Sequence, residues 1–227
     1  PADRAARDPE LRAAAEEYLG DGWATDLGCG TGATARAFGP AARWRLVDHD
    51  AALLAEARER VPGARIHALD LGAPGAFGGL PLAGARMVTA SALLDLTPRA
   101  WIEALADRLA AEGIAAYVAL TYDGGLDWRP PVAGDMAVCA AFNRHQRRDK
   151  GLGPALGFEA APVFAAAMRT RGYAVRVARS PWRLGPGALR DELETGIAAA
   201  AAEAGGPVAD WLQARRAARG GGSVTVG

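Results

Sequence analysis

The residues best placed to do chemistry are a carboxylate and three alternating glycines, in the stretch Asp26-Leu27-Gly28-Cys29-Gly30-Thr31-Gly32. Glycines allow the backbone to turn sharply and to approach a ligand closely. A carboxylate next to them would repel a pyrophosphate, but it would attract the cationic amino-acid part of a cofactor. The stretch therefore predicts a loop that binds a small cofactor with a positive group. The alternative is a tight turn that binds nothing.

Two further acids follow at the ends of the next predicted strands. Asp48 lies 22 residues beyond Asp26, where an acid can accept both hydroxyls of a ribose. Asp48 could instead cap the next helix, a role that the sequence assigns more directly to Asp50. Asp70 follows a short third strand, and its alternative role is a turn before Gly72.

The pattern acid-x-Gly-x-Gly-x-Gly resembles the first motif of the class I S-adenosylmethionine-dependent methyltransferases. The resemblance implies an α/β fold of three layers, Rossmann-like, with a seven-stranded, mostly parallel sheet whose last strand is antiparallel and lies between the fifth and sixth. It implies that Asp70 bonds the adenine amino group and that the next backbone N–H meets a ring nitrogen. The residues expected to bind the cofactor are Asp26, Gly28, Cys29, Gly30, Asp48, His49, Asp70, Leu71 and Ser91.

The acceptor is expected near the ends of the fourth and fifth strands. The stretch from Ser91 to Leu96 resembles the family's fourth motif, which lies beside the transferable methyl group. Asp95 in this stretch either faces substrate or serves as a loop or capping residue. Tyr122 and Asp123 follow the fifth strand, and ligands of open α/β sheets bind at the carboxyl ends of the strands.

A segment without a clear strand, residues 126–159, is predicted to form a lid over these strand ends. It holds the only asparagine of the chain, Asn143, and the only lysine, Lys150. Together with Arg147 these side chains would suit an anionic acceptor, although charged runs usually only face solvent. His145 is the candidate general base and Tyr122 a second catalytic candidate; His145 could equally be a loop residue in contact with solvent.

The remaining elements fit one domain over residues 1–227. A lead-in helix is predicted at 8–20, with Asp8 as its cap, and a sixth strand is predicted from Tyr173 to Ala178 by its alternating pattern. A helical insertion at 188–219 separates that strand from a last strand at 223–226. This insertion departs from the hairpin that usually joins the two strands in the resembled family.

Composition excludes several classes of protein. The chain has 227 residues, of which 50% are apolar, and its 26 acids balance its 26 bases. Because the net charge is zero, the sequence does not predict the strong positive electrostatic potential that binding to nucleic acid or to a membrane surface requires. Two cysteines are typical of a reducing cytoplasm, and three widely separated histidines indicate no metal site.

The sequence therefore favours an S-adenosylmethionine-dependent methyltransferase that acts on a small molecule and releases S-adenosylhomocysteine. The protein would chiefly align the reactants for in-line displacement, because the sulfonium is already activated. One alternative is an NAD(P)-dependent oxidoreductase, since Gly28, Gly30 and Ala33 fit its loop loosely. Another is a non-catalytic S-adenosylmethionine-binding regulatory protein.

Overall fold

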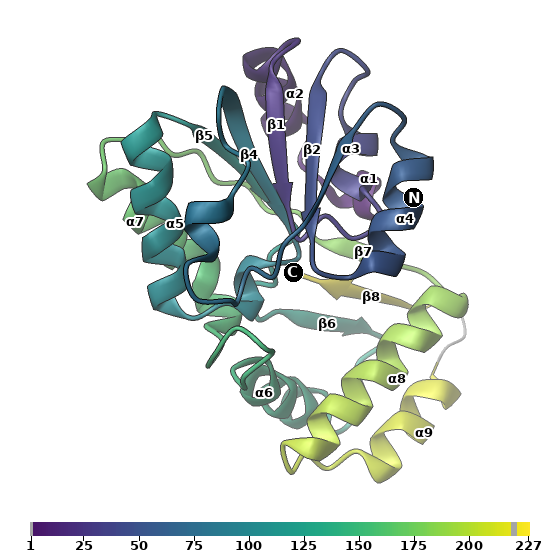
Figure 1. Cartoon of the computed structure of the whole chain (residues 1–227). Helices are drawn as coiled ribbons and strands as arrows, with labels where there is room; N and C mark the ends of the chain where they lie inside the picture. The colour runs from purple at the N-terminus through teal and green to yellow at the C-terminus, as the bar shows by residue number, and fades with distance from the viewer. Residues whose placement is uncertain (1, 219–221) are drawn as a thin grey trace.

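The computed structural model describes residues 2–218 and 222–227. Its centre is a parallel five-stranded sheet with the strand order β3-β2-β1-β4-β5 (Figure 1). The strands are β1 (Trp23–Leu27), β2 (Arg43–Asp48), β3 (Arg65–Ala68), β4 (Ala85–Ser91) and β5 (Ala115–Ala119). The predicted α/β class and the mostly parallel sheet are confirmed.

Helices cover both faces of this sheet, which makes three layers. One face packs on α2 (Pro9–Leu19), α3 (Ala33–Ala37) and α4 (Ala51–Arg60). The other packs on α5 (Arg99–Glu112) and α7 (Ala160–Thr170). Caps read from the sequence are present: the Asp8 carboxylate accepts from the Leu11 amide at 2.8 Å, and the Asp50 carboxylate accepts from the amides of Ala52 and Leu53.

A second, three-stranded sheet lies across the carboxyl ends of the main strands (Figure 1). Its strands are β6 (Leu126–Arg129), β7 (Trp182–Leu184) and β8 (Ser223–Val226), in the order β6-β8-β7 with β8 antiparallel to both neighbours. It packs on α6 (Asp135–Gln146), α8 (Ala188–Glu203) and α9 (Ala209–Ala217) through a core that includes Trp128 and Trp211. The remaining short elements are α1 (Ala2–Ala6), η1 (Ala76–Gly79), η2 (Leu94–Leu96) and η3 (Gly157–Glu159).

The prediction of one seven-stranded sheet is wrong in the part of the chain that the structure describes. The antiparallel last strand is present and has a strand on either side, but these are β6 and β7 of the small sheet. Backbone bonds continue the β6–β8 ladder up to the end of β5: the Asp123 amide donates to the Gly227 carbonyl at 3.1 Å. The sheet is thus divided just after β5, where Leu120 adopts a φ of 56° and Gly124 a φ of 91°.

Two local predictions are also corrected. The segment 173–178 is not a strand. Apolar and polar residues alternate in this segment because Tyr173 and Val175 pack against the core, whereas Val177 is 70% exposed. One side of the segment is therefore partly buried although its backbone pairs with no neighbouring strand. The segment 126–159 does contain a strand, β6, in which Leu126 and Trp128 alternate with polar residues and pair with β8.

The predicted helical insertion forms α8 and α9, and its last residue, 219, lies outside the described residues. Across residues 2–218 and 222–227, no helix combines the length and the apolar content that crossing a bilayer requires.

Candidate cofactor site

The loop after β1 has the backbone that its glycines predict. Gly28, Gly30 and Gly32 have φ values of 61°, 51° and 79°, all in the left-handed region that favours glycine. A Cβ on Gly32 would lie 2.8 Å from a Val61 methyl group, whereas a Cβ on Gly30 would meet nothing within 4 Å. Gly30 therefore borders open space. The helix that follows, α3, has only five residues.

Asp26 is buried at the end of β1, with 1% of its surface exposed. Its Oδ1 accepts a hydrogen bond from the Thr89 hydroxyl at 2.6 Å, and its Oδ2 has no partner within the described residues. Burial raises the pKa of Asp26 to about 7, although the Thr89 hydrogen bond and the Arg7 charge oppose this change. An unpartnered carboxylate oxygen in such surroundings is costly unless a ligand supplies a donor.

Arg7 was not predicted, and it lies beside this carboxylate. It is 3% exposed, and its Nη2 donates to Ser91 Oγ at 2.9 Å and to Thr34 Oγ1 at 3.3 Å. Its Nε and Nη1 find no acceptor in the part of the chain that the structure describes. We call Arg7, Thr34, Asp26, Thr89 and Ser91 the Asp26 site. The signal that could have found Arg7 is weak, because it is one of many arginines and precedes the lead-in helix.

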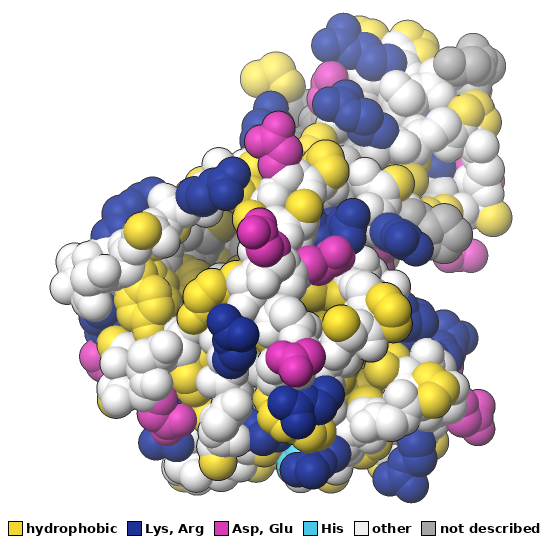
Figure 2. Space-filling model, turned by 90° about the horizontal axis from the view of Figure 1, so that it is seen from above, with side chains coloured by type: hydrophobic (Ala, Val, Ile, Leu, Met, Phe, Trp, Pro, Cys, Tyr) yellow, Lys and Arg dark blue, Asp and Glu magenta, His cyan; other side chains and the backbone are white. Residues whose placement is uncertain are grey.

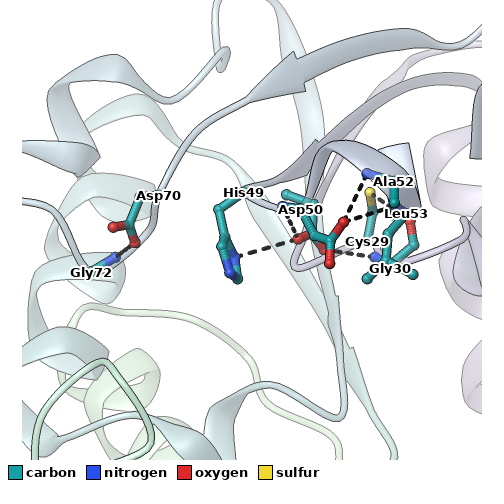
Figure 3. Close-up of polar contacts among 9 residues, drawn as sticks. Cys29, Gly30, His49, Asp50, Ala52, Leu53, Asp70 and Gly72 are labelled. Carbon is teal, nitrogen blue, oxygen red and sulfur yellow. Dashed lines mark hydrogen bonds and ion pairs between the residues drawn. The ribbon is translucent and has the colours of Figure 1, made fainter. Parts of the chain in front are cut away.

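Asp48 links β2 to the glycine loop. Its Oδ2 accepts from the Gly30 amide at 2.9 Å and its Oδ1 from the Asp50 amide at 3.1 Å. The exposed His49 approaches the same carboxylate, with Nδ1 3.5 Å from Oδ1. Cys29 is buried in the loop, and its amide donates to the Val47 carbonyl at 3.0 Å. Figure 3 shows Gly30, His49 and Asp50 around this loop, with dashed lines for their hydrogen bonds and the ion pair.

Asp70 lies at the end of β3, where Figure 3 shows it folded back on Gly72. Its Oδ1 accepts from the Gly72 amide at 2.8 Å, which is the turn geometry that the sequence left open as an alternative. The neighbouring Leu71 is buried, and its carbonyl accepts from the Trp101 indole at 2.9 Å. The predicted lid reaches this point, since a Cβ on Gly72 would lie 3.0 Å from the Gly151 carbonyl oxygen.

Asp95 follows β4 in the short helix η2. It is 8% exposed, and Oδ1 has no partner among the described residues. Burial raises the pKa of Asp95 to about 6, and hydrogen bonds from the backbone at Asp95 and Tyr122 oppose the rise. The structure thus brings Asp95 and Tyr122 together at the carboxyl ends of β4 and β5.

Tyr122 is buried and its hydroxyl donates to Asn143 Oδ1 at 2.7 Å. Burial raises the pKa of this hydroxyl, so it stays protonated and acts as a hydrogen-bond donor. The Asn143 amide group in turn donates to the Gly124 carbonyl at 3.1 Å. Asp123 is partly exposed, accepts from the Gly125 amide and lies 3.5 Å from Arg179.

Of the other predicted lid residues, His145 and Arg147 pair with acids of the fold and Lys150 contacts His145. His145 Nε2 lies 3.1 Å from Glu203 on α8, and its Nδ1 lies 3.1 Å from the Lys150 ammonium. Arg147 approaches Glu159 at 3.5 Å. We call Asn143, His145, Arg147, Arg148 and Lys150 the α6 cluster; its Arg148 also bonds Glu203. Side chains two positions apart on a helix do not face each other, so His145 is not on the side of α6 that carries Asn143 to Tyr122.

A cavity of about 410 Å³ lies between β6 and α6. Asn143 lines it, with Asp127, Trp128, Asp135 and Cys139 among the others. No glycine-loop residue lines it. Among the described residues, no group of His, Cys, Asp and Glu side chains could hold a metal ion.

Comparisons with known proteins give structural likeness only. No protein-family model matches the chain, and no curated protein matches it. A S-adenosylmethionine-dependent methyltransferase from Mesorhizobium loti is 16% identical, with 100% of this chain and 99% of that chain covered and a TM-score of 0.48. DesVI of Streptomyces venezuelae is 19% identical, with 56% of this chain and 57% of that chain covered and a TM-score of 0.40.

The amino pentose methyltransferase CalS10 of Micromonospora echinaspora, a protein of calicheamicin biosynthesis, is 26% identical, with 52% of either chain covered and a TM-score of 0.37. The chain thus spans little more than half the length of the latter two proteins. The solved structures to which this chain is similar include S-adenosylmethionine-dependent methyltransferases.

Proposed function

We propose that this protein is an S-adenosylmethionine-dependent methyltransferase that acts on a small-molecule acceptor. The observation that carries the proposal is the pair of buried, oppositely charged groups with unfilled hydrogen-bonding atoms: Asp26 Oδ2 on one side, Arg7 Nε and Nη1 on the other. Buried polar atoms normally have partners, so such a pair indicates a ligand with one cationic and one anionic group. An amino-acid moiety has both.

The residues present fit this cofactor. In the proposal Asp26 accepts from the ammonium of the amino-acid part and Arg7 donates to its carboxylate, while Ser91 and Thr34 orient the guanidinium. Asp48 holds Gly30 in place through its amide, and the same carboxylate is the candidate for the ribose hydroxyls. Asp70 and the backbone at Leu71 are the candidates for the adenine.

When bound, this cofactor supplies a methyl group on a sulfonium, which is an activated electrophile. The protein then has to exclude water, align the acceptor and, where the attacking atom carries a proton, remove it. We assign proton removal to Asp95 in preference to the predicted His145 and Tyr122. The pKa of Asp95 is raised by burial to about 6, close to neutral pH, and Oδ1 is unpartnered within the described residues. Tyr122, whose backbone bonds Asp95, and the following residue Asp123 are the candidates for acceptor contacts.

The acceptor itself we propose to be small, because the cavity between β6 and α6, which Asn143 lines beside Tyr122, has a volume of only about 410 Å³. An anionic acceptor remains the expectation from the basic α6 cluster, although its pairing with Glu203 and Glu159 leaves less positive charge for a ligand than the sequence predicts.

The test is calorimetric titration of the purified chain with S-adenosylhomocysteine, S-adenosylmethionine and NADH. We expect micromolar binding of the first two and a loss of about 30-fold or more in Asp48→Ala, because charged hydrogen bonds contribute about 1.5–3 kcal/mol each. Asp50→Ala, which removes only a helix cap, is the matched control and should keep its affinity. Binding of NADH alone would contradict the proposal and favour an oxidoreductase.

A further inference from the structure

Three arginines gather around one tryptophan at the amino end of the main sheet. Trp23 on β1 is paired with Arg43 on β2, and Arg45 on β2 is paired with Arg65 on β3. Successive side chains on a strand alternate between faces, so these odd-numbered residues all lie on the same face of the sheet. His67, two positions after Arg65, shares that face. We call Trp23, Arg43, Arg45, Arg65 and His67 the Trp23 patch.

The guanidinium groups of the patch all lie close to the Trp23 ring. Their central carbons are 5.1, 4.8 and 4.4 Å from the centre of the Trp23 ring, for Arg43, Arg45 and Arg65 respectively. Each such contact is favourable by roughly 0.5–2 kcal/mol. Like charges directly opposite each other on neighbouring strands are unfavourable, and Arg45 and Arg65 are such a pair. The arrangement therefore concentrates positive charge. The repulsion between the arginines is unfavourable, and the contacts with the indole ring offset it in part.

No carboxylate of the described residues forms an ion pair with these three arginines. Elsewhere in the molecule, arginines such as Arg171 and Arg190 are paired with acids. Arg45 is held in place, because its two terminal nitrogens donate to the carbonyls of Pro81 and Ala83 at 2.8 and 2.7 Å. Arg43 and Arg65 are exposed, and the terminal nitrogens of their guanidinium groups have no acceptor in the described structure.

His67 adds one more unfilled polar atom. Its Nε2 is buried and has no partner among residues 2–218 and 222–227. Burial and the charges of Arg45 and Arg65 lower the pKa of His67, so its ring is neutral at pH 7. Figure 2, which shows the molecule from above, has dark blue Lys and Arg side chains in several groups on this side of the molecule. The patch thus has the positive charge and the hydrogen-bond donors that would bind an anion, and it contains no carboxylate that could take this role.

We propose that the Trp23 patch binds a compact anion with two or three linked phosphate groups. The planar fork of arginine matches phosphate oxygens. Two exposed guanidiniums, those of Arg43 and Arg65, with the positive charge of the buried Arg45 beside them, favour a ligand with more than one negative charge. A nucleic acid strand is a poorer fit, because the only aromatic face is already covered by guanidiniums and cannot stack on bases. Trp23, Arg43 and Arg65 are the first residues of their strands, whereas Asp26 is near the carboxyl end of β1, so the proposed anion site is separate from the proposed cofactor site.

The test is calorimetric titration of the full chain with inorganic tripolyphosphate at low and moderate salt. We expect micromolar binding that weakens as salt is raised, falls at least tenfold in the double variant Arg43→Gln/Arg65→Gln, and is intermediate in Arg65→Lys, which keeps the charge but loses the fork. Arg58→Gln, an exposed arginine on the opposite helical layer, is the matched control and should bind as the wild type does.

S-adenosylhomocysteine titrations of the double variant should match those of the wild type, which separates this site from the proposed cofactor site. Absence of tripolyphosphate binding to the wild type, or equal binding by the double variant, would overturn the proposal. So would a single-stranded oligonucleotide that binds through Arg43 and Arg65 more tightly than tripolyphosphate does. Because both arginines are exposed, the single variant Arg65→Gln provides a folded protein should the double variant lose its structure.

Discussion

The Asp26 site and the α6 cluster both gather charged and polar side chains, yet the two differ in how these side chains are paired. In the Asp26 site, Asp26 and Arg7 are buried and keep unfilled hydrogen-bonding atoms. In the α6 cluster, Asn143, His145 and Lys150 bond to one another or to Tyr122 and Glu203. The difference teaches that rare residue types in a segment do not by themselves indicate a ligand site. Buried polar atoms without a hydrogen-bond partner are the better indication of a place where a ligand binds.

The largest effect is expected from Asp26→Asn. A folded-state pKa of about 7 against an ordinary value of 3.8 means that the folded protein holds this proton more tightly than the unfolded chain. Ionisation of Asp26 therefore lowers the free energy of unfolding as pH rises from about 4 to about 7. Asp26→Asn should be more stable than wild type at pH 8 by roughly 2–4 kcal/mol, and this difference should shrink toward pH 4.

Urea denaturation of both proteins at pH 4.5 and pH 8 measures this difference, and Asp21→Asn, which removes an exposed carboxylate, is the control. An equal difference at the two pH values would show that Asp26 is not a strained, buried acid. The Asp26 site would then resemble the α6 cluster in being satisfied by the protein alone.

The next effect concerns Arg7→Ala. Loss of a charge-assisted hydrogen bond to the cofactor carboxylate should weaken S-adenosylhomocysteine binding by about 10- to 100-fold. Binding of 5′-methylthioadenosine, which lacks the amino-acid part, should not change. Arg4→Ala, which changes an exposed arginine of the short helix α1 just before Arg7, should behave as wild type in both titrations. If both ligands lost affinity equally, Arg7 would only support the local fold.

A smaller effect is expected from Tyr122→Phe. The change leaves Asn143 Oδ1 without its donor at 2.7 Å and should cost about 1 kcal/mol of unfolding free energy. A double-mutant cycle with Asn143→Ala, followed by chemical denaturation, should return a coupling of about that size. Zero coupling would mean that this pair does not hold α6 against the end of β5.

The smallest effect is expected from Lys150→Ala on cofactor binding. Its ammonium is held by His145 at 3.1 Å, so the affinity for S-adenosylhomocysteine should stay within about twofold of wild type. Calorimetric titration measures this directly. A tenfold loss of affinity would show that Lys150 contacts the cofactor. The α6 cluster would then be a ligand site like the Asp26 site, although its side chains are paired within the protein.

Some features could be predicted from the sequence because they depend on neighbours along the chain. Left-handed φ values at Gly28, Gly30 and Gly32 follow from residue type, and the caps at Asp8 and Asp50 follow from side chains that bond amides two or three positions on. The five parallel strands follow from apolar runs between turn signals. The sequence pattern wrongly predicted a strand from Tyr173 to Ala178. Alternating apolar residues also occur where an extended segment packs one side on the core without hydrogen bonds to a neighbouring strand.

Only the tertiary structure decided which distant residues meet. Arg7 reaches Ser91, 84 residues later, and His145 reaches Glu203, 58 residues later. The last strand joined β6 and β7 in a separate sheet because the chain bends after β5, where Leu120 and Gly124 adopt positive φ. Such contacts depend on how whole helices and strands pack, and packing energy is summed over many residues that no short window of sequence contains. The sequence by itself determined the glycine loop and its acids, and the packing of the whole chain determined their partners.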